Sequence, residues 1–178
     1  MDYPWYQVVS GPELEQGDIL ESCPVFLPRT DLTDLSGAEK DSIFFDEELR
    51  DVIVLSQSCD LVARQEKVSE VLLCPLWQRG QLVPPHYLAT GKGMEDARRG
   101  ILPGFHVLSA CTQPDFDREV RVVDFRRVYS LPVPFFRDQA EKSVARLRLL
   151  PPYREHLSQA FARFFMRVGL PVNIAPFR

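Results

Sequence analysis

The chain has 178 residues, of which 45% are hydrophobic and 26% charged, and its formal net charge is −4. These values are ordinary for a globular domain and exclude wholesale disorder. The negative balance argues against non-specific binding to a phosphate backbone, although it leaves room for a local basic face. The 15 prolines favour short strands and many connections over long helices.

No stretch of the sequence is long and apolar enough to span a bilayer, and the start, MDYPWYQVV, lacks the pattern of a secretory signal. We therefore expect a cytoplasmic protein without membrane contact. The four cysteines, Cys23, Cys59, Cys74 and Cys111, include no CxxC pair, which indicates reduced and mostly buried thiols. Because Cys and His also lack the close spacing typical of zinc sites, we expect no metal and no cofactor.

The first predicted strand follows a turn at Gly17 and runs from Ile19 towards Leu27, where Pro28 stops it. The next segment, residues 29–49, is polar and acidic, and we expect it to form a long surface loop.

Two apolar runs are the strongest strand candidates. DVIVLS (51–56) is a continuous, largely β-branched stretch, as expected when both faces of a strand are covered, and SEVLLCPL (69–76) is the second. The connection between them is short enough for the two strands to be neighbours in one closed, curled sheet. The polar residues at 56–60 would then lie on the rim of that sheet.

The middle of the chain is rich in Gly and Pro and shows one weak helical patch, near Met94 to Arg98. Two later runs, 105–110 and 118–131, alternate as half-buried strands do. The end of the chain is predicted to be helical over 137–150 and 151–171. The last helix carries an apolar stripe of Leu157, Phe161, Phe164, Phe165 and Val168, expected to be core or a dimer contact, and Gly169 and Pro171 predict its end.

Together these elements predict a mainly β protein with helices at its C-terminal end. We expect a small SH3-like barrel of about five to seven short strands over residues 1–135. One or two helices from residues 136–178 would pack on this barrel.

Four pieces of the chain and its final helix follow one another in a recognisable order. The pieces are QGDIL (16–20), RDVIVLSQ (50–57), EVLLCPL (70–76) and VVDFRRVYSL (122–131). This order resembles the MazF/PemK toxins, which are small SH3-like barrels of toxin–antitoxin modules. The resemblance implies cleavage of single-stranded RNA without a metal, by an Arg before the second long strand and a Ser or Thr after the third.

In this chain Arg50 matches the family's arginine and would hold the phosphate, with Ser56 or Asp60 as its polar partner. Trp77 stands where the family has a Ser or Thr, and Asp51 stands where it has a Pro. These departures favour a non-catalytic interaction or regulatory module, in a stress or defence operon, that associates with itself as a homodimer or with a protein partner. An endoribonuclease is the alternative.

Five further residues are candidates for binding. Gln57, Ser58 and Cys59 are expected to line a recognition groove at the end of the strand. Arg126 and Arg127, with aromatic residues nearby, are typical of a single-stranded RNA surface. Alternatively, these arginines form a solvated face, or they bind an acidic partner protein or the chain's own acidic loop.

Cys59 has two further interpretations. A thiol enzyme that uses Cys59 is a third functional alternative, which the acidic neighbour Asp60 disfavours. The preferred interpretation is a small buried residue in the turn that ends the strand.

Overall fold

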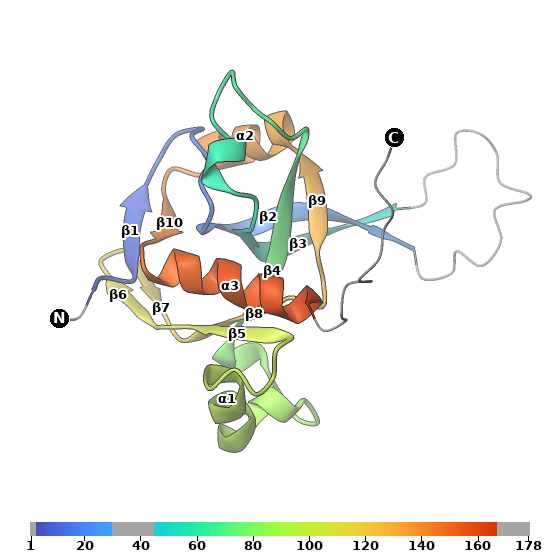
Figure 1. The fold of residues 1–178 in the computed structure, drawn as a ribbon, viewed down its shortest axis with the longest axis vertical. Helices are drawn as coiled ribbons and strands as arrows, with labels where there is room; N and C mark the ends of the chain where they lie inside the picture. The colour runs from blue at the N-terminus through green and yellow to red at the C-terminus, as the bar shows by residue number, and fades with distance from the viewer. Residues whose placement is uncertain (1–2, 30–44, 167–178) are drawn as a thin grey trace, which may run out of the picture.

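The computed structural model describes residues 3–29 and 45–166, which form ten strands and three α-helices (Figure 1). The strands are β1 (Tyr6–Val9), β2 (Asp18–Pro28), β3 (Phe45–Val54), β4 (Glu70–Gln78), β5 (Phe105–Leu108), β6 (Cys111–Gln113), β7 (Phe116–Arg118), β8 (Arg121–Asp124), β9 (Tyr129–Pro132) and β10 (Arg146–Leu149). The helices are α1 (Gly91–Arg98), α2 (Val133–Lys142) and α3 (Tyr153–Phe165), with short 3-10 turns at Ser58–Asp60, Arg79–Gln81 and Tyr87–Ala89. The predicted mainly β protein with helices near its C-terminal end is confirmed.

Eight strands form one antiparallel sheet in the order β1-β10-β2-β3-β4-β8-β5, with β9 also paired to β4, while β6 and β7 form a separate hairpin. The sheet forks at β4, because Glu70–Leu73 pair with β9 and Leu76–Gln78 pair with β8. Its end strands β1 and β5 do not pair with each other within the described residues. The sheet is therefore open, and the expectation of a closed barrel is wrong.

The two strongest apolar runs do form neighbouring strands. β3 and β4 pair in antiparallel register, with Ile53 opposite Cys74. Val52, Ile53 and Val54 are all fully buried, and they alternate between the core under α2 and the core under α3. Burying each such side chain contributes about 1.5–3 kcal/mol. The run is continuously apolar because both of its faces are covered.

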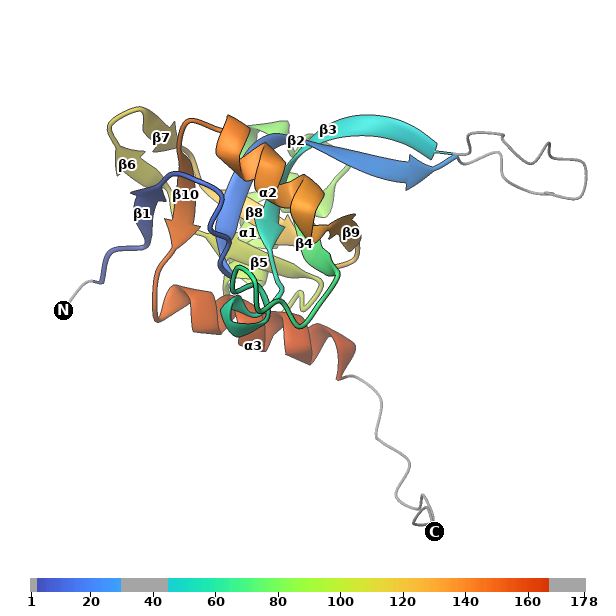
Figure 2. The ribbon, with the colours of Figure 1, turned by 90° about the horizontal axis from the view of Figure 1, so that it is seen from above.

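The two longer helices cover opposite faces of the sheet (Figure 2). α2 inserts the fully buried Phe136 into the core on one face. On the other face α3 contributes Leu157, Phe161 and Phe164, as its predicted apolar stripe requires, whereas Phe165 is 58% exposed. The rest of that stripe and its stop signal lie beyond residue 166, outside the described residues.

The helix predicted over residues 137–150 is only partly present. α2 ends at Lys142, and β10 then lies between β1 and β2 in the sheet. The sequence of β10, RLRL, alternates in period two. Its two leucines are buried in the core under α3, and its two arginines bind a buried carboxylate. Tertiary contacts therefore make this segment a strand.

The outer parts of β2 and β3 extend from the body as a two-stranded arm (Figure 2). Since β3 begins at Phe45, the last residues of the segment 29–49 are strand and not loop. The predicted loop at residues 30–44 lies outside the described residues.

α1 confirms the helical patch predicted near Met94 to Arg98, and it closes a small third core around Ala97. The neighbouring strand β5 is an edge of the sheet. Phe105 packs against the small core, whereas the ring of His106 stacks on Phe125 in the core under α3. β5 therefore presents successive side chains to two different surfaces.

Candidate functional site

The polar residues after β3 close the connection to β4. The Ser56 hydroxyl accepts a hydrogen bond from a backbone N–H of β4 at 2.9 Å, and the Ser58 hydroxyl accepts one from the backbone N–H of Gln16 at 3.1 Å. Asp60 forms a 3.5 Å salt bridge with Lys67 in the same connection. Ser56 and Asp60 are thus engaged in holding the connection in place.

A pocket of about 390 Å³, which we call the polar pocket, opens between this connection and α3. Its lining residues are Gln16, Gln57, Ser58, Cys59, Arg154, Glu155, Ser158 and Gln159. The Gln57 amide donates to the Ser158 hydroxyl at 3.2 Å. The predicted binding residues Gln57, Ser58 and Cys59 therefore share one pocket. Cys59 is exposed on its 3-10 turn, so the expectation that it is buried is wrong.

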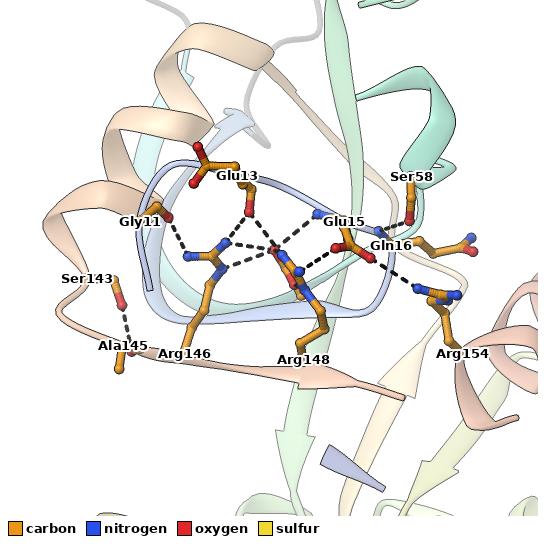
Figure 3. Close-up of polar contacts among 11 residues, drawn as sticks. Gly11, Glu13, Glu15, Gln16, Ser58, Ser143, Ala145, Arg146, Arg148 and Arg154 are labelled. Carbon is orange, nitrogen blue, oxygen red and sulfur yellow. Dashed lines mark hydrogen bonds and ion pairs between the residues drawn. The ribbon is translucent and has the colours of Figure 1, made fainter. Parts of the chain in front are cut away.

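A buried ion network lies beside the polar pocket (Figure 3). The fully buried Asp18 carboxylate accepts hydrogen bonds from Arg146 Nε at 3.0 Å, from Arg148 Nη2 at 2.9 Å and from the backbone N–H of Glu15 at 3.2 Å. Both guanidinium groups also donate to carbonyl groups of the loop between β1 and β2. The two arginines of β10 are therefore balanced by acceptors from the N-terminal part of the chain.

The network reaches the surface through Glu15 (Figure 3). One carboxylate oxygen of Glu15 binds Arg148, and the other accepts from Arg154 of α3 at 3.2 Å. Arg154 also donates to Glu155 at 3.2 Å. The arginine that lines the polar pocket is therefore already paired with two carboxylates, which leaves little of its charge for an anionic ligand.

Arg50 lies away from the polar pocket. It precedes Ser56 by six residues of mostly extended chain, a span of about 20 Å. The Arg50 guanidinium pairs with Glu48 and lies 5.2 Å from the centre of the Trp77 ring. The structure therefore does not bring Arg50 together with Ser56 and Asp60, the other two residues proposed for catalysis.

Arg126 and Arg127 lie on a different surface, at two adjoining pockets that both arginines line. One pocket, of about 280 Å³, also includes Trp77 and Phe105, and the other, of about 520 Å³, includes Tyr129. The remaining lining residues are Phe26, Leu27, Pro28, Phe45, Gln81, Leu82, Val83, His86, Asp124, Val128 and Ser130. We call these two pockets together the Arg–aromatic groove.

The single carboxylate among these lining residues, Asp124, is already neutralised. It accepts two hydrogen bonds of 2.8 Å from the Arg126 guanidinium, which lies 4.2 Å from the centre of the Phe105 ring. Arg127 is exposed and enters no salt bridge with any residue of the described ranges. An arginine in this state is available to bind a phosphate or carboxylate.

One polar group that lines the groove, and one that lies against the lining residue Trp77, have no hydrogen bond of normal geometry within the described residues. Within the described residues, the Tyr129 hydroxyl and Arg50 Nε are buried and form no hydrogen bond. Burial raises the pKa of Tyr129, whereas the Arg127 side chain, which lies within reach of the hydroxyl, and the Arg50 cation act in the opposite direction. Because an unmade buried hydrogen bond costs about 1–3 kcal/mol, a ligand that supplied an acceptor here would gain affinity.

A further pocket of about 300 Å³, the α1–α3 pocket, adjoins the groove, since both are lined by Phe105. Its other charged or titratable lining residues are Arg98, Arg99, His106, His156 and Arg163. The sequence pattern predicts the adjacent pair Arg126 and Arg127 as candidates, but it predicts no function for this pocket. Its residues come from three elements that no local pattern connects.

Comparisons with models of known protein families, with curated proteins and with solved structures found no match to this chain. Across residues 3–29 and 45–166, His, Cys, Asp and Glu side chains nowhere gather in threes as a metal site would require. No helix in the same ranges has the length and apolar character needed to cross a membrane. The geometry of the pockets therefore carries the functional argument.

Proposed function

We propose that the protein binds single-stranded RNA in the Arg–aromatic groove and does not cleave it. The observation that carries the proposal is that Arg127, a cation without a salt bridge in the described part of the chain, lies in one groove with the rings of Trp77, Phe105 and Tyr129. Single-strand binding surfaces combine cations that follow the phosphates with rings on which bases stack, each stacked base contributing about 1–3 kcal/mol.

The charge distribution supports the groove over the polar pocket as the RNA site. In the polar pocket, Arg154 is paired with two carboxylates, whereas Arg127 in the groove pairs with no carboxylate of residues 3–29 and 45–166. Because the formal net charge of the chain is −4, attraction for a polyanion has to come from such a local surface.

The distance between Arg50 and the two polar residues supports binding without cleavage. RNA cleavage of this type needs a base and a cation at the same phosphate. Ser56 and Asp60 are engaged in the β3–β4 connection, and Arg50 pairs with Glu48 on another part of β3. The protein would then share a single-stranded RNA ligand with the MazF/PemK toxins that its sequence resembles, without their chemistry. A homodimer or a protein partner stays a prediction.

Fluorescence anisotropy with a labelled RNA strand about 12 nucleotides long tests the proposal. The single strand is expected to bind more tightly than a duplex of the same sequence, because duplex bases are not free to stack on the rings. Arg127→Gln should raise the Kd about five- to tenfold near 0.1 M salt and should lower the slope of log K against log salt by about one.

Arg64→Gln is the matched control, since Arg64 is an exposed arginine of the β3–β4 connection and lines neither pocket of the groove. Equal binding by the wild type and Arg127→Gln would contradict the proposal. The length of the RNA is checked after incubation, and fragments that disappear with Arg50→Ala would establish a ribonuclease instead.

A further inference from the structure

The α1–α3 pocket lies where α3 passes β5 on the side of α1 (Figure 1). Phe105 and His106 of β5 contribute to it, and Arg98 and Arg99 enter from the C-terminal end of α1. The side chains from α3 are His156, Gln159, Ala160 and Arg163. The end of α1, β5 and α3 therefore all contribute side chains to this one pocket.

The contribution of α3 follows from its helical period. His156, Gln159, Ala160 and Arg163 are spaced three, four and seven residues apart, so they share one face of the helix. The small side chain of Ala160 leaves room between its longer neighbours. This face of α3 consequently presents an imidazole, an amide and a guanidinium to the same pocket.

The lining of this pocket carries cations without any carboxylate. Arg98 makes two hydrogen bonds of 2.7 Å to Glu95, outside the lining. Arg99 and Arg163 are exposed and form no salt bridge within the part of the chain that the structure describes. Among the described residues, the pocket therefore holds two guanidinium groups without a salt bridge, and Glu95, which lies near Arg99 as well, is bound by the third.

The two imidazoles complete the set of donors. Burial and, to a smaller extent, repulsion from His156 together lower the pKa of His106 to about 4. At neutral pH His106 is therefore uncharged and still offers one N–H donor or one acceptor.

The number of donors matches a phosphate monoester better than a phosphodiester. A monoester carries a charge of about −1.5 to −2 at pH 7 and has three strong acceptor oxygens, whereas a diester carries one charge. The pocket also lies at one end of the Arg–aromatic groove, which it meets through Phe105. A strand that lies along the groove would therefore place its terminus there.

We propose that the α1–α3 pocket binds the terminal phosphate monoester of a single RNA strand, so that the protein prefers phosphorylated ends. This inference rests on the proposed function for the orientation of the strand. Arg99 from the end of α1 and Arg163 from α3 bind the phosphate, and the last base reaches Phe105, which the pocket shares with the groove.

The inference is tested with three RNAs of one sequence that carry a 5′-phosphate, a 3′-phosphate or two hydroxyl ends. One phosphorylated form is expected to bind about tenfold more tightly than the hydroxyl form, and which form it is gives the polarity of the strand. The double substitution Arg99→Gln/Arg163→Gln should remove most of that difference. Arg64→Gln, outside both sites, should retain it.

Equal binding of all three RNAs would overturn the inference. If Arg127→Gln still weakened binding of the hydroxyl form, the proposed binding of RNA in the Arg–aromatic groove would remain supported. In a second experiment, the imidazole resonances of His106 and His156 are followed by NMR during titration with a phosphorylated dinucleotide. This readout does not depend on the groove, because both rings line the α1–α3 pocket and neither lines the groove. We expect both to shift, and no shift would contradict the assignment. Inorganic phosphate that bound as tightly as the phosphorylated strand would also overturn it, since the strand would then contribute nothing.

Discussion

The polar pocket and the Arg–aromatic groove both contain arginine, but the fold treats the two sets of arginines differently. Beside the polar pocket, Arg146, Arg148 and Arg154 are bound by Asp18 and acidic neighbours (Figure 3). In the groove, Arg126 is paired with Asp124, whereas Arg127 forms no salt bridge with any residue that the structure describes. Whether an arginine is available to a ligand therefore depends on which carboxylates the fold brings to it. The number of basic residues in a segment does not decide it.

The largest loss of stability is expected when the buried carboxylate that binds the arginines of β10 is removed. Asp18→Asn keeps the shape of the side chain but removes the counter-charge of the buried Arg146 and one of the two carboxylates that bind Arg148. Removing one partner from a buried ion pair typically costs about 3–5 kcal/mol. The free energy of unfolding, measured with urea, should fall by that amount.

The control for Asp18→Asn is Asp138→Asn, because Asp138 forms an exposed salt bridge with Lys142. This pair is expected to contribute less than about 0.5 kcal/mol. Equal stability losses for the two variants would show that the buried network is not what holds β10 in the sheet.

A smaller effect is expected from His106 in the α1–α3 pocket. Burial lowers the pKa of His106 to about 4 in the folded protein, against about 6.5 when unfolded. Its contribution to stability is therefore fully present above pH 6.5 and is lost as the pH falls towards 4, because the unfolded chain takes up the proton first. The loss amounts to at most about 3 kcal/mol, measured by urea unfolding at pH 7 and pH 4.5.

His106→Phe preserves the stacking on Phe125 and should flatten this part of the pH dependence. His156→Gln removes only the repulsion from an exposed ring, so this variant should keep most of the pH dependence of stability. If wild type and His106→Phe lost the same stability between the two pH values, the buried imidazole would not be the source.

The smallest effect on stability is expected from a substitution in the groove itself. Tyr129→Phe removes a buried hydroxyl that has no hydrogen-bond partner in the described structure. The free energy of unfolding should change by less than about 1 kcal/mol, whereas the Kd for single-stranded RNA should rise about fivefold. Unchanged RNA affinity would show that the hydroxyl does not contact the ligand.

The parts of the fold that the sequence predicts well are those with local causes. The β3 run is continuously apolar and β-branched because both faces are buried, and the stripe on α3 follows the helical period. β10 was missed for a reason that is not local. Its arginines are buried because Asp18, about 130 residues earlier in the chain, supplies their counter-charge. A pattern read within one segment cannot include that partner.

The same limit applies to the candidate sites. Arg126 and Arg127 were identifiable because they are adjacent in sequence, and Gln57, Ser58 and Cys59 because they end an apolar run. The α1–α3 pocket combines residues of α1, β5 and α3, which only the folded chain brings together. The prediction that Arg50 acts with Ser56 and Asp60 treated neighbours along a strand as neighbours in space, although an extended strand separates such residues.

The most direct test of the central claim is to map where RNA contacts the protein. A single strand that carries a photoreactive uridine is cross-linked to the wild type, and the modified peptides are identified by mass spectrometry. The account predicts cross-links at Trp77, Phe105 or Tyr129 in the Arg–aromatic groove. Cross-links confined to Gln57–Cys59 and the facing part of α3 would contradict it, because they would place the RNA in the polar pocket.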